Sequence, residues 1–241
     1  MAYGKSIELF LVNGTADSLI TAELSNWNGK AIKIPRIEVP TCSREDIKQA
    51  GVYFLFCKED NGKDSVYIGE AENVKERLIQ HLRDAQAEKE KYYWNTAVIF
   101  IGRDLNKALI RYLENRFVEI ARQCNRYEVL TKNTYKNTVL KESQVASMEE
   151  FVDNVRILIN ALGYKVLDAY TNAIPKENPV GDTEKKEDIK LYLERVIKNV
   201  GKIEAQGTIT SEGFIVLKGS QISPVDDNTV PDTIKEQRCT S

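Results

Sequence analysis

Two short apolar runs, residues 51–56 and 65–69, constrain the fold of this chain more than any other feature. Both are rich in strand formers, and each carries one tyrosine, Tyr53 in the first and Tyr67 in the second. Residues 61–63 between them read Asn-Gly-Lys, which is a strong signal for a hairpin turn. Because side chains alternate across a strand, the two tyrosines can face the same side, depending on the register. The runs therefore predict a β-hairpin with two tyrosines.

A helix is expected directly after this hairpin, starting near Asn73. Apolar residues recur there at helical spacing: Val74, Leu78, Leu82 and Ala85. Arg77 and His81 are one helical turn apart, so they lie on one face, with His81 at the edge of the apolar arc and Arg77 beside it. The single histidine of the chain and a charged group are therefore expected to point toward the sheet rather than toward solvent.

An aromatic triplet at 92–94 leads into a buried strand at 97–101, and a second helix is expected from about residue 106 to 124. Glu114 lies at the boundary of the apolar arc of this helix. A carboxylate in that position is costly to bury unless it is paired or bound to a metal ion. Glu114 is therefore expected to be either paired with a cationic side chain such as Arg77 or bound to a metal ion.

The charge of the chain is unevenly distributed. The formal net charge is −2, so composition gives no general sign of nucleic-acid binding. Residues 103–141, however, contain nine basic and four acidic residues, a local net charge of +5. This stretch is either an ordinary solvated face or a surface that tracks phosphates.

The remaining composition excludes several classes of protein. Hydrophobic residues make up 42% of the chain, enough for a packed core. The four cysteines form no CxxC pair, which argues against a zinc site and a disulfide framework. The amino terminus lacks the pattern of a signal peptide, and no apolar run is long enough for a membrane helix. We therefore expect a soluble, cytoplasmic protein.

The segment before the hairpin is expected to be a β meander that packs on the following domain. Trp27 and Lys30 could alternatively contact substrate. A short helix is expected over 42–50, with Thr41 or Ser43 as its N-cap. The meander strands are expected at residues 7–12, 19–24 and 31–34.

The second half of the chain contains one more long helix and a separate unit. The helix is expected over 147–162, where Ser147 to Glu150 has a capping-box pattern. The proline-punctuated polar stretch 175–188 is the best linker in the chain. The other expected elements are a strand at 164–170, a strand or helix at 189–200, a hairpin of 203–209 with 213–220, and a loose tail at 224–241.

The central stretch resembles the GIY-YIG nuclease family. GVY stands at 51–53 and VYIG at 66–69, and Arg77, His81 and Glu114 follow in the order found in that family. Arg77 lies ten positions after the second tyrosine, and His81 lies four positions after Arg77. The resemblance covers roughly residues 48–135. It implies an α+β fold with a three-stranded antiparallel sheet flanked by helices.

The resemblance also implies a role for each matching residue. Glu114 would bind one Mg²⁺ or Mn²⁺ ion, which would polarise a phosphate oxygen and stabilise the leaving oxyanion. Arg77 would hold the scissile phosphate through its fork of donors. Tyr53 and Tyr67 would orient or deprotonate the attacking water, and His81 could share that role as a base or bond a tyrosine hydroxyl.

Two positions depart from the family pattern. Several members have a lysine after YIG that can lower a tyrosine pKa, but here the residue is Glu70. This shifts the expected base from a tyrosine toward His81. The family also has a late asparagine near the site, which is either Asn133 or Asn125 here; Asn133 fits the longer bacterial spacing.

The flanks extend the resemblance. Residues 1–175 are similar to a bacterial group in which the nuclease module follows a small β leader. Residues 207–224 look like a C-terminal domain of unknown function, which usually continues further, so a truncated or shortened form is expected here. The predicted domains are the leader (1–46), the nuclease domain with a supporting helix and strand (47–175), the linker (176–188) and a β-rich C-terminal unit (189–241).

The predicted function is a divalent-metal-dependent endonuclease that hydrolyses phosphodiester bonds in nucleic acid, with DNA as the expected substrate. The alternative is an inactive or weakly active module of the same fold that binds nucleic acid or a partner protein. A protein partner of the C-terminal unit is a third possibility.

Overall fold

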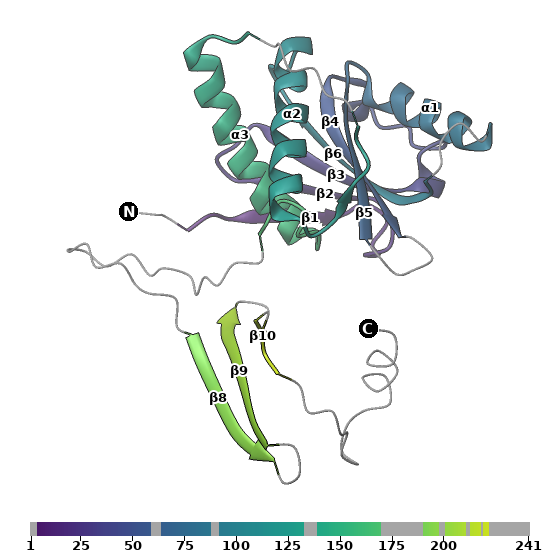
Figure 1. The fold of residues 1–241 in the computed structure, drawn as a ribbon. Coiled ribbons are helices and arrows are strands. Elements are labelled where there is room, and N and C mark those ends of the chain that lie inside the picture. The colour runs from purple at the N-terminus through teal and green to yellow at the C-terminus, as the bar shows by residue number, and fades with distance from the viewer. Residues whose placement is uncertain are drawn as a thin grey trace. The chain divides into compact units, whose positions relative to one another are not determined.

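The structure is a computed structural model of the 241-residue chain (Figure 1). It describes residues 4–58, 64–87, 92–132, 139–169, 190–197, 201–210, 213–217 and 219–221. The chain divides into two compact units, Ala2–Ala169 and Tyr170–Ser241. The finer domain boundaries expected from the sequence stay predictions.

The first unit is built on one seven-stranded sheet in the order β1-β2-β3-β6-β4-β5-β7. All neighbouring strands are antiparallel except the short parallel pair of β5 and β7. The strands are β1 (Ile7–Leu11), β2 (Ile20–Leu24), β3 (Gly29–Pro35), β4 (Gly51–Lys58), β5 (Asp64–Ala71), β6 (Trp94–Gly102) and β7 (Glu128–Val129). The predicted family core of three antiparallel strands is the part β6-β4-β5.

The N-terminal meander is continuous with this core sheet. β3 pairs with β6 over its whole length, from Gly29 opposite Gly102 to Pro35 opposite Thr96. β6 therefore has a hydrogen-bonded partner on each side, β3 and β4. The sequence predicted a meander that packs on the domain, whereas the structure shows three further strands of the same sheet.

Helices cover both faces of the sheet. α1 (Val74–Gln86) packs on one face, and α2 (Lys107–Cys124) and α3 (Glu142–Ala161) pack on the other (Figure 1). The predicted starts of α1 and α2 are confirmed, since Asn73 accepts a hydrogen bond from Glu76 N and Asn106 accepts one from Leu109 N.

Alternation along β4 divides its side chains between two hydrophobic clusters. Val52, Phe54 and Phe56 face α2 and α3, whereas Tyr53 and Leu55 face α1. The strand is buried on both sides, which explains why its sequence reads as a continuous apolar run. This division also determines the face on which Tyr53 lies.

α3 begins earlier than the sequence predicted. It starts at Glu142 rather than Ser147, and the Gln144 side chain accepts a hydrogen bond from Lys141 N at 3.0 Å. Ser147 does not cap a helix, because its hydroxyl donates to the Ser143 carbonyl inside the first turns of α3 at 3.0 Å. The predicted capping box is therefore wrong.

Two other predicted elements are also wrong. The helix expected over 42–50 is reduced to one turn of 3₁₀ helix, Asp46–Lys48, preceded by Glu45, because Gln49 is already extended and leads into β4. A second 3₁₀ turn spans Arg36–Glu38 after β3. The strand expected at 164–170 is absent from its described part, 164–169, which is irregular apart from a turn at 166–167.

The second unit contains a three-stranded antiparallel sheet in the order β10-β9-β8. Its strands are β8 (Lys190–Ile197), β9 (Gly201–Thr210) and β10 (Gly213–Val216). The predicted hairpin is thus confirmed, and the segment left open between strand and helix is a strand. The predicted linker and tail lie outside the described residues.

Within the part of the chain that the structure describes, none of the helices combines the length and the apolar character needed to cross a membrane.

Candidate active site

The β4–β5 hairpin brings the two motif tyrosines together. Tyr53 is paired with Gly69 and Tyr67 with Leu55, so the tyrosines lie diagonally on the same face of the hairpin. Their rings are stacked with centroids 6.3 Å apart. The predicted common face is therefore correct. Tyr92, which precedes β6, stacks on Tyr67, with 5.6 Å between the two ring centroids.

Both motif glycines occupy positions where a side chain would collide with the site. A Cβ atom on Gly69 would lie 2.5 Å from the Tyr53 hydroxyl oxygen and 2.9 Å from the Tyr67 ring. A Cβ atom on Gly51 would lie 2.6 Å from the Phe100 carbonyl oxygen. These glycines are needed for close approach rather than for a left-handed backbone, since neither has a positive φ angle.

His81 reaches the tyrosines from α1. Its side chain is 1% exposed, and its Nε2 atom shares a hydrogen bond of 2.9 Å with the Tyr53 hydroxyl. Its ring packs edge-on against Tyr67, with centroids 5.2 Å apart. Burial, followed by the positive charges of Arg77 and Arg36, lowers the pKa of His81 from 6.5 to about 3. The imidazole is therefore neutral near pH 7.

The Tyr53 hydroxyl is the less accessible of the two. Tyr53 is 1% exposed, and burial raises its pKa well above the ordinary value of 10.0. Tyr67 is only partly buried. A protonated Tyr53 bonded to a neutral His81 thus forms the inner part of the site, and Tyr67 forms the part nearer to solvent.

Arg77 lies on the same face of α1, one turn before His81. It interacts with the hydroxyls of both Tyr53 and Tyr67 through charge and hydrogen bonding. Burial opposes its charge, but the two tyrosine hydroxyls outweigh that effect and raise its pKa further. Arg77 therefore stays fully charged beside the tyrosines.

Glu114 lies inward from α2, as predicted, with 6% of its surface exposed. Burial, and then the negative charge of Glu70, raise the pKa of Glu114 from 4.5 to about 7, although Lys107, Arg111 and Arg77 act in the opposite direction. Among the residues that the structure describes, its carboxylate has no hydrogen-bond or ion-pair partner. A buried carboxylate without a partner fits a cation ligand.

A site with one such carboxylate suits a hard divalent cation. The described residues contain no group of three or more His, Cys, Asp or Glu side chains that could hold a metal. Mg²⁺ is commonly bound by one or two carboxylates and completes its shell with water and substrate phosphate oxygens. The donor set around Glu114 is therefore compatible with a magnesium-type ion and argues against zinc.

Glu70, which follows the YIG triplet, is held by cations from α2. Its side chain is 7% exposed, and its oxygens lie 3.0 Å from Lys107 Nζ and 3.7 Å from Arg111 Nε. The positive charge at this corner thus comes from α2 rather than from the residue after the YIG motif. Sequence reasoning missed this arrangement because it depends on the packing of α2 on β5.

The basic stretch 103–141 is largely occupied by contacts within the protein. Arg116 pairs with Glu149 at 2.9 Å, Arg122 donates to the Thr131 carbonyl oxygen at 2.6 Å, and Arg126 donates to a carbonyl in the segment after α3. Together with Lys107, these residues have structural partners. The structure therefore shows intramolecular partners for several of these cations and leaves open the choice between a solvated face and a phosphate-tracking surface.

Of the two candidates for the late asparagine, the structure describes Asn125 but not Asn133. Asn133 lies outside the described residues, so its role stays a prediction. Asn125 is the exposed C-cap of α2 with a left-handed backbone (φ 51°), a conformation that asparagine tolerates well. Thr131 fixes the segment that leads to Asn133, because its hydroxyl donates to Ile68 O at 2.7 Å and accepts from Ile68 N at 2.8 Å.

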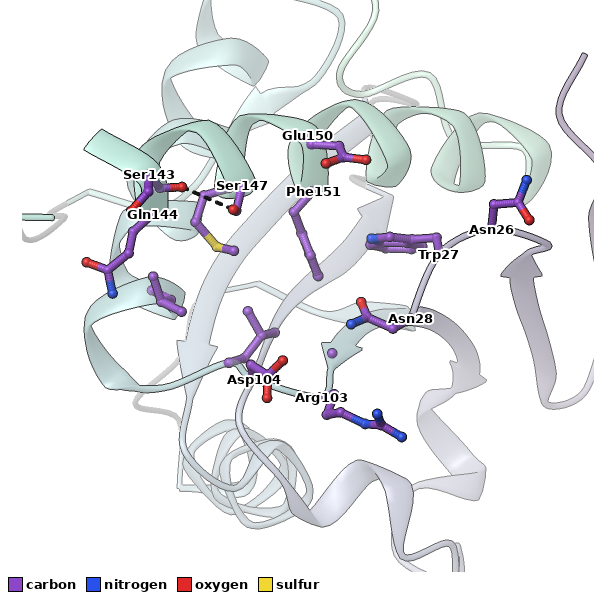
Figure 2. Close-up of a pocket in the computed structure, with 14 residues that line it drawn as sticks. Asn26, Trp27, Asn28, Arg103, Asp104, Ser143, Gln144, Ser147, Glu150 and Phe151 are labelled. Carbon is purple, nitrogen blue, oxygen red and sulfur yellow. Dashed lines mark hydrogen bonds between the residues drawn. The ribbon is translucent and has the colours of Figure 1, made fainter. Parts of the chain in front are cut away.

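A cavity of about 720 Å³ lies on the opposite face of the sheet, beneath α3. Figure 2 shows Trp27 and Phe151 projecting into it, and their rings meet edge-on with centroids 4.8 Å apart. None of the predicted catalytic residues lines it. Lys30, the other residue considered for substrate contact, pairs with Glu23 at 2.9 Å. The cavity is therefore separate from the tyrosine cluster.

Comparison with known proteins agrees with this geometry. Residues 49–137 match the family model described as the GIY-YIG catalytic domain. No curated protein and no solved structure gave a significant match. The matched region contains the hairpin, Arg77, His81 and Glu114. Residues 49–137 therefore form a catalytic domain of the GIY-YIG nuclease family.

Proposed function

We propose that this protein is a divalent-metal-dependent endonuclease that cleaves phosphodiester bonds in DNA. Nuclease-type chemistry follows from the catalytic domain; the substrate, the metal and the residue roles are the proposal. The single observation that carries it is Glu114, a buried carboxylate without a protein partner, in the electrostatic range of the guanidinium of Arg77.

Each side chain of the cluster has one role in this proposal. Arg77 binds the scissile phosphate, because its planar fork matches two phosphate oxygens. Tyr67 contacts the attacking water, since its side chain is more exposed than that of Tyr53. Tyr53 and His81 hold the inner side of the site in place through their mutual hydrogen bond.

Glu114 would hold Mg²⁺ or Mn²⁺, and the bound ion would supply Lewis-acid stabilisation of charge on the phosphate and the leaving oxygen. This charge stabilisation must provide most of the rate enhancement. Proton transfer by a positioned side chain contributes only about 10²–10⁴-fold.

The base that removes the proton from water is assigned here to the Tyr67 region rather than to His81 directly. His81 Nε2 already bonds the Tyr53 hydroxyl, and the ring is almost fully buried. Its pKa of about 3 also makes the imidazole a weak proton acceptor near pH 7, so its role is to hold the Tyr53 hydroxyl in place. The expected preference for His81 as the base thus gives way to Tyr67.

The second candidate function is a binding module of the same fold. The acidic residue Glu70 at the position after YIG and the net charge of −2 favour it. In that case the C-terminal unit would contact a partner protein. The cytoplasmic location expected from the sequence is likewise a proposal, whichever of the two functions holds.

Nicking of a supercoiled plasmid with Mg²⁺ tests the proposal against this alternative. We expect the parent protein to nick the plasmid and Glu114→Gln to be inactive. Glu119→Gln, on the exposed side of the same helix, is the matched control and should keep the parent rate. Equal product from the parent and from Glu114→Gln would refute the catalytic role and leave a binding module.

A further inference from the structure

Arg36 lies between two aromatic side chains at the start of β6. Its guanidinium carbon is 4.5 Å from the centre of the Tyr93 ring and 4.7 Å from that of the Trp94 ring. Arg36 belongs to the 3₁₀ turn after β3, outside the matched catalytic domain. The aromatic contacts hold the position of its guanidinium without neutralising its charge.

This guanidinium has no counterion within the described part of the chain. The Arg36 side chain makes no ion pair or hydrogen bond there, and its Nη1 atom is buried without an acceptor. Arginine cannot lose its proton in a protein, so the charge persists. A partly buried cation without an anionic partner is costly, and bound anions commonly relieve that cost.

A second donor beside it also lacks an acceptor. Trp94 is fully buried, and its Nε1 atom has no hydrogen-bond partner among the described residues. Buried indole N–H groups usually find an acceptor. Because the indole is fully buried under the guanidinium, Arg36 is the member of the pair that can meet an anion from solvent.

The position of Arg36 connects it to the active site. Tyr92, Tyr93 and Trp94 are consecutive; Tyr92 stacks on Tyr67, and the next two residues hold Arg36. The charge of Arg36 also reaches His81. One short aromatic segment therefore contacts both the substrate-facing tyrosine and this guanidinium.

We infer that Arg36 binds a phosphodiester group of the nucleic-acid substrate next to the scissile one, with its guanidinium held in place by the Tyr93 and Trp94 rings. The inference rests on the proposed function and deepens it. The leader strands thus contribute a substrate-positioning residue to the catalytic domain. A purely structural stack would hold the same rings together but would add no phosphate contact.

Binding of a fluorescein-labelled DNA duplex, measured by anisotropy with Ca²⁺ in place of Mg²⁺, separates the two readings. Arg36→Met keeps the length and the aromatic packing but removes the charge, and Arg36→Lys keeps the charge. Arg103→Met removes the same charge from an exposed residue that lines the cavity beneath α3, and it is the matched control. Affinity is measured at several salt concentrations, and urea unfolding confirms that each variant is folded.

We expect Arg36→Met to weaken binding about tenfold or more, because a charge-assisted contact is lost. The slope of log affinity against log salt should fall by about 0.9, the value for one phosphate contact. Arg36→Lys should keep most of the slope. Arg103→Met should show a smaller loss, since it changes only the overall charge.

An independent readout uses the two tryptophans of the chain. In a Trp27→Phe background Trp94 is the single tryptophan, and DNA should change its emission unless Arg36 is also replaced by Met. An unchanged salt slope in Arg36→Met, or a loss equal to that of Arg103→Met, would overturn the inference while the proposed function stands. If the parent protein neither binds nor nicks DNA, the proposed function fails, and this inference fails with it.

Discussion

The Glu114→Gln variant is expected to become more stable than the parent protein as the pH rises. Burial and the nearby Glu70 carboxylate raise the pKa of Glu114 from 4.5 to about 7. Folding therefore favours the protonated acid, and the stability associated with it is present below pH 4.5 and is lost as the pH rises through about 7. Glutamine has nearly the same shape and no charge, so the variant should not show this loss.

The size of the effect follows from the two pKa values. A rise from 4.5 to about 7 corresponds to at most about 3.5 kcal/mol, at about 1.4 kcal/mol for each pH unit. His81 acts in the opposite direction, because its pKa falls from 6.5 to about 3 on folding and its stability contribution is therefore lost as the pH falls through that window. Both proteins contain His81, so its effect cancels in the difference between them.

The assay is urea unfolding of both proteins in EDTA across this pH range. We expect the two stabilities to be similar near pH 4.5 and to separate progressively up to about pH 8. Mn²⁺ at about ten times its dissociation constant should then stabilise the parent by about 1.4 kcal/mol and leave the variant unchanged. The second effect tests metal binding without relying on activity.

Glu119→Gln serves again as the control, because its carboxylate is exposed and should not respond in this way. Parallel pH profiles for the parent protein and Glu114→Gln would refute the reasoning. Such a result would mean that the buried carboxylate is fully compensated in the apo protein, and the argument for a cation at Glu114 would be lost.

Three further predictions concern the tyrosine cluster. Gly69→Ala places a Cβ atom 2.5 Å from the Tyr53 hydroxyl oxygen, so unfolding in urea should show a loss of about 1–3 kcal/mol, whereas Gly4→Ala, with nothing within 4 Å, should show none. Tyr67→Phe should reduce plasmid nicking by about 10²–10⁴-fold and Tyr53→Phe by less; a larger loss for Tyr53→Phe would contradict the division of roles. Arg77→Lys keeps the charge but loses the fork, and its nicking rate should fall about tenfold or more; a full rate would exclude two-point phosphate binding.

Local sequence patterns predicted most of the elements that carry the site. Runs of strand-forming residues and turn chemistry located the β4–β5 hairpin, and apolar residues at helical spacing located α1 and α2. The positions of Arg77 and His81 on one helix face followed from helical periodicity. These features succeed because each depends on residues close together in the chain.

The features that sequence reasoning missed depend on contacts between distant segments. The apolar pattern of the leader identifies strands but does not state that β3 pairs with β6. The pairing of Glu70 with Lys107 and the stacking of Arg36 on Trp94 join residues far apart in sequence. The predicted start of α3 is too late because a serine followed by glutamates has the same sequence pattern inside a helix as at its beginning.

The pairing of β3 with β6 has a practical consequence for the design of shortened versions of the protein. A fragment cut at the limits of the family match, 49–137, would strip β6 of one hydrogen-bonding neighbour along nearly its whole length. That edge is apolar and carries no charged residue from Ala97 to Ile101, which is the character of an aggregation-prone edge strand. It would also discard Arg36. Insolubility of such a fragment would therefore reflect the loss of β3 as the hydrogen-bonding partner of β6. A soluble shortened protein should keep all three leader strands.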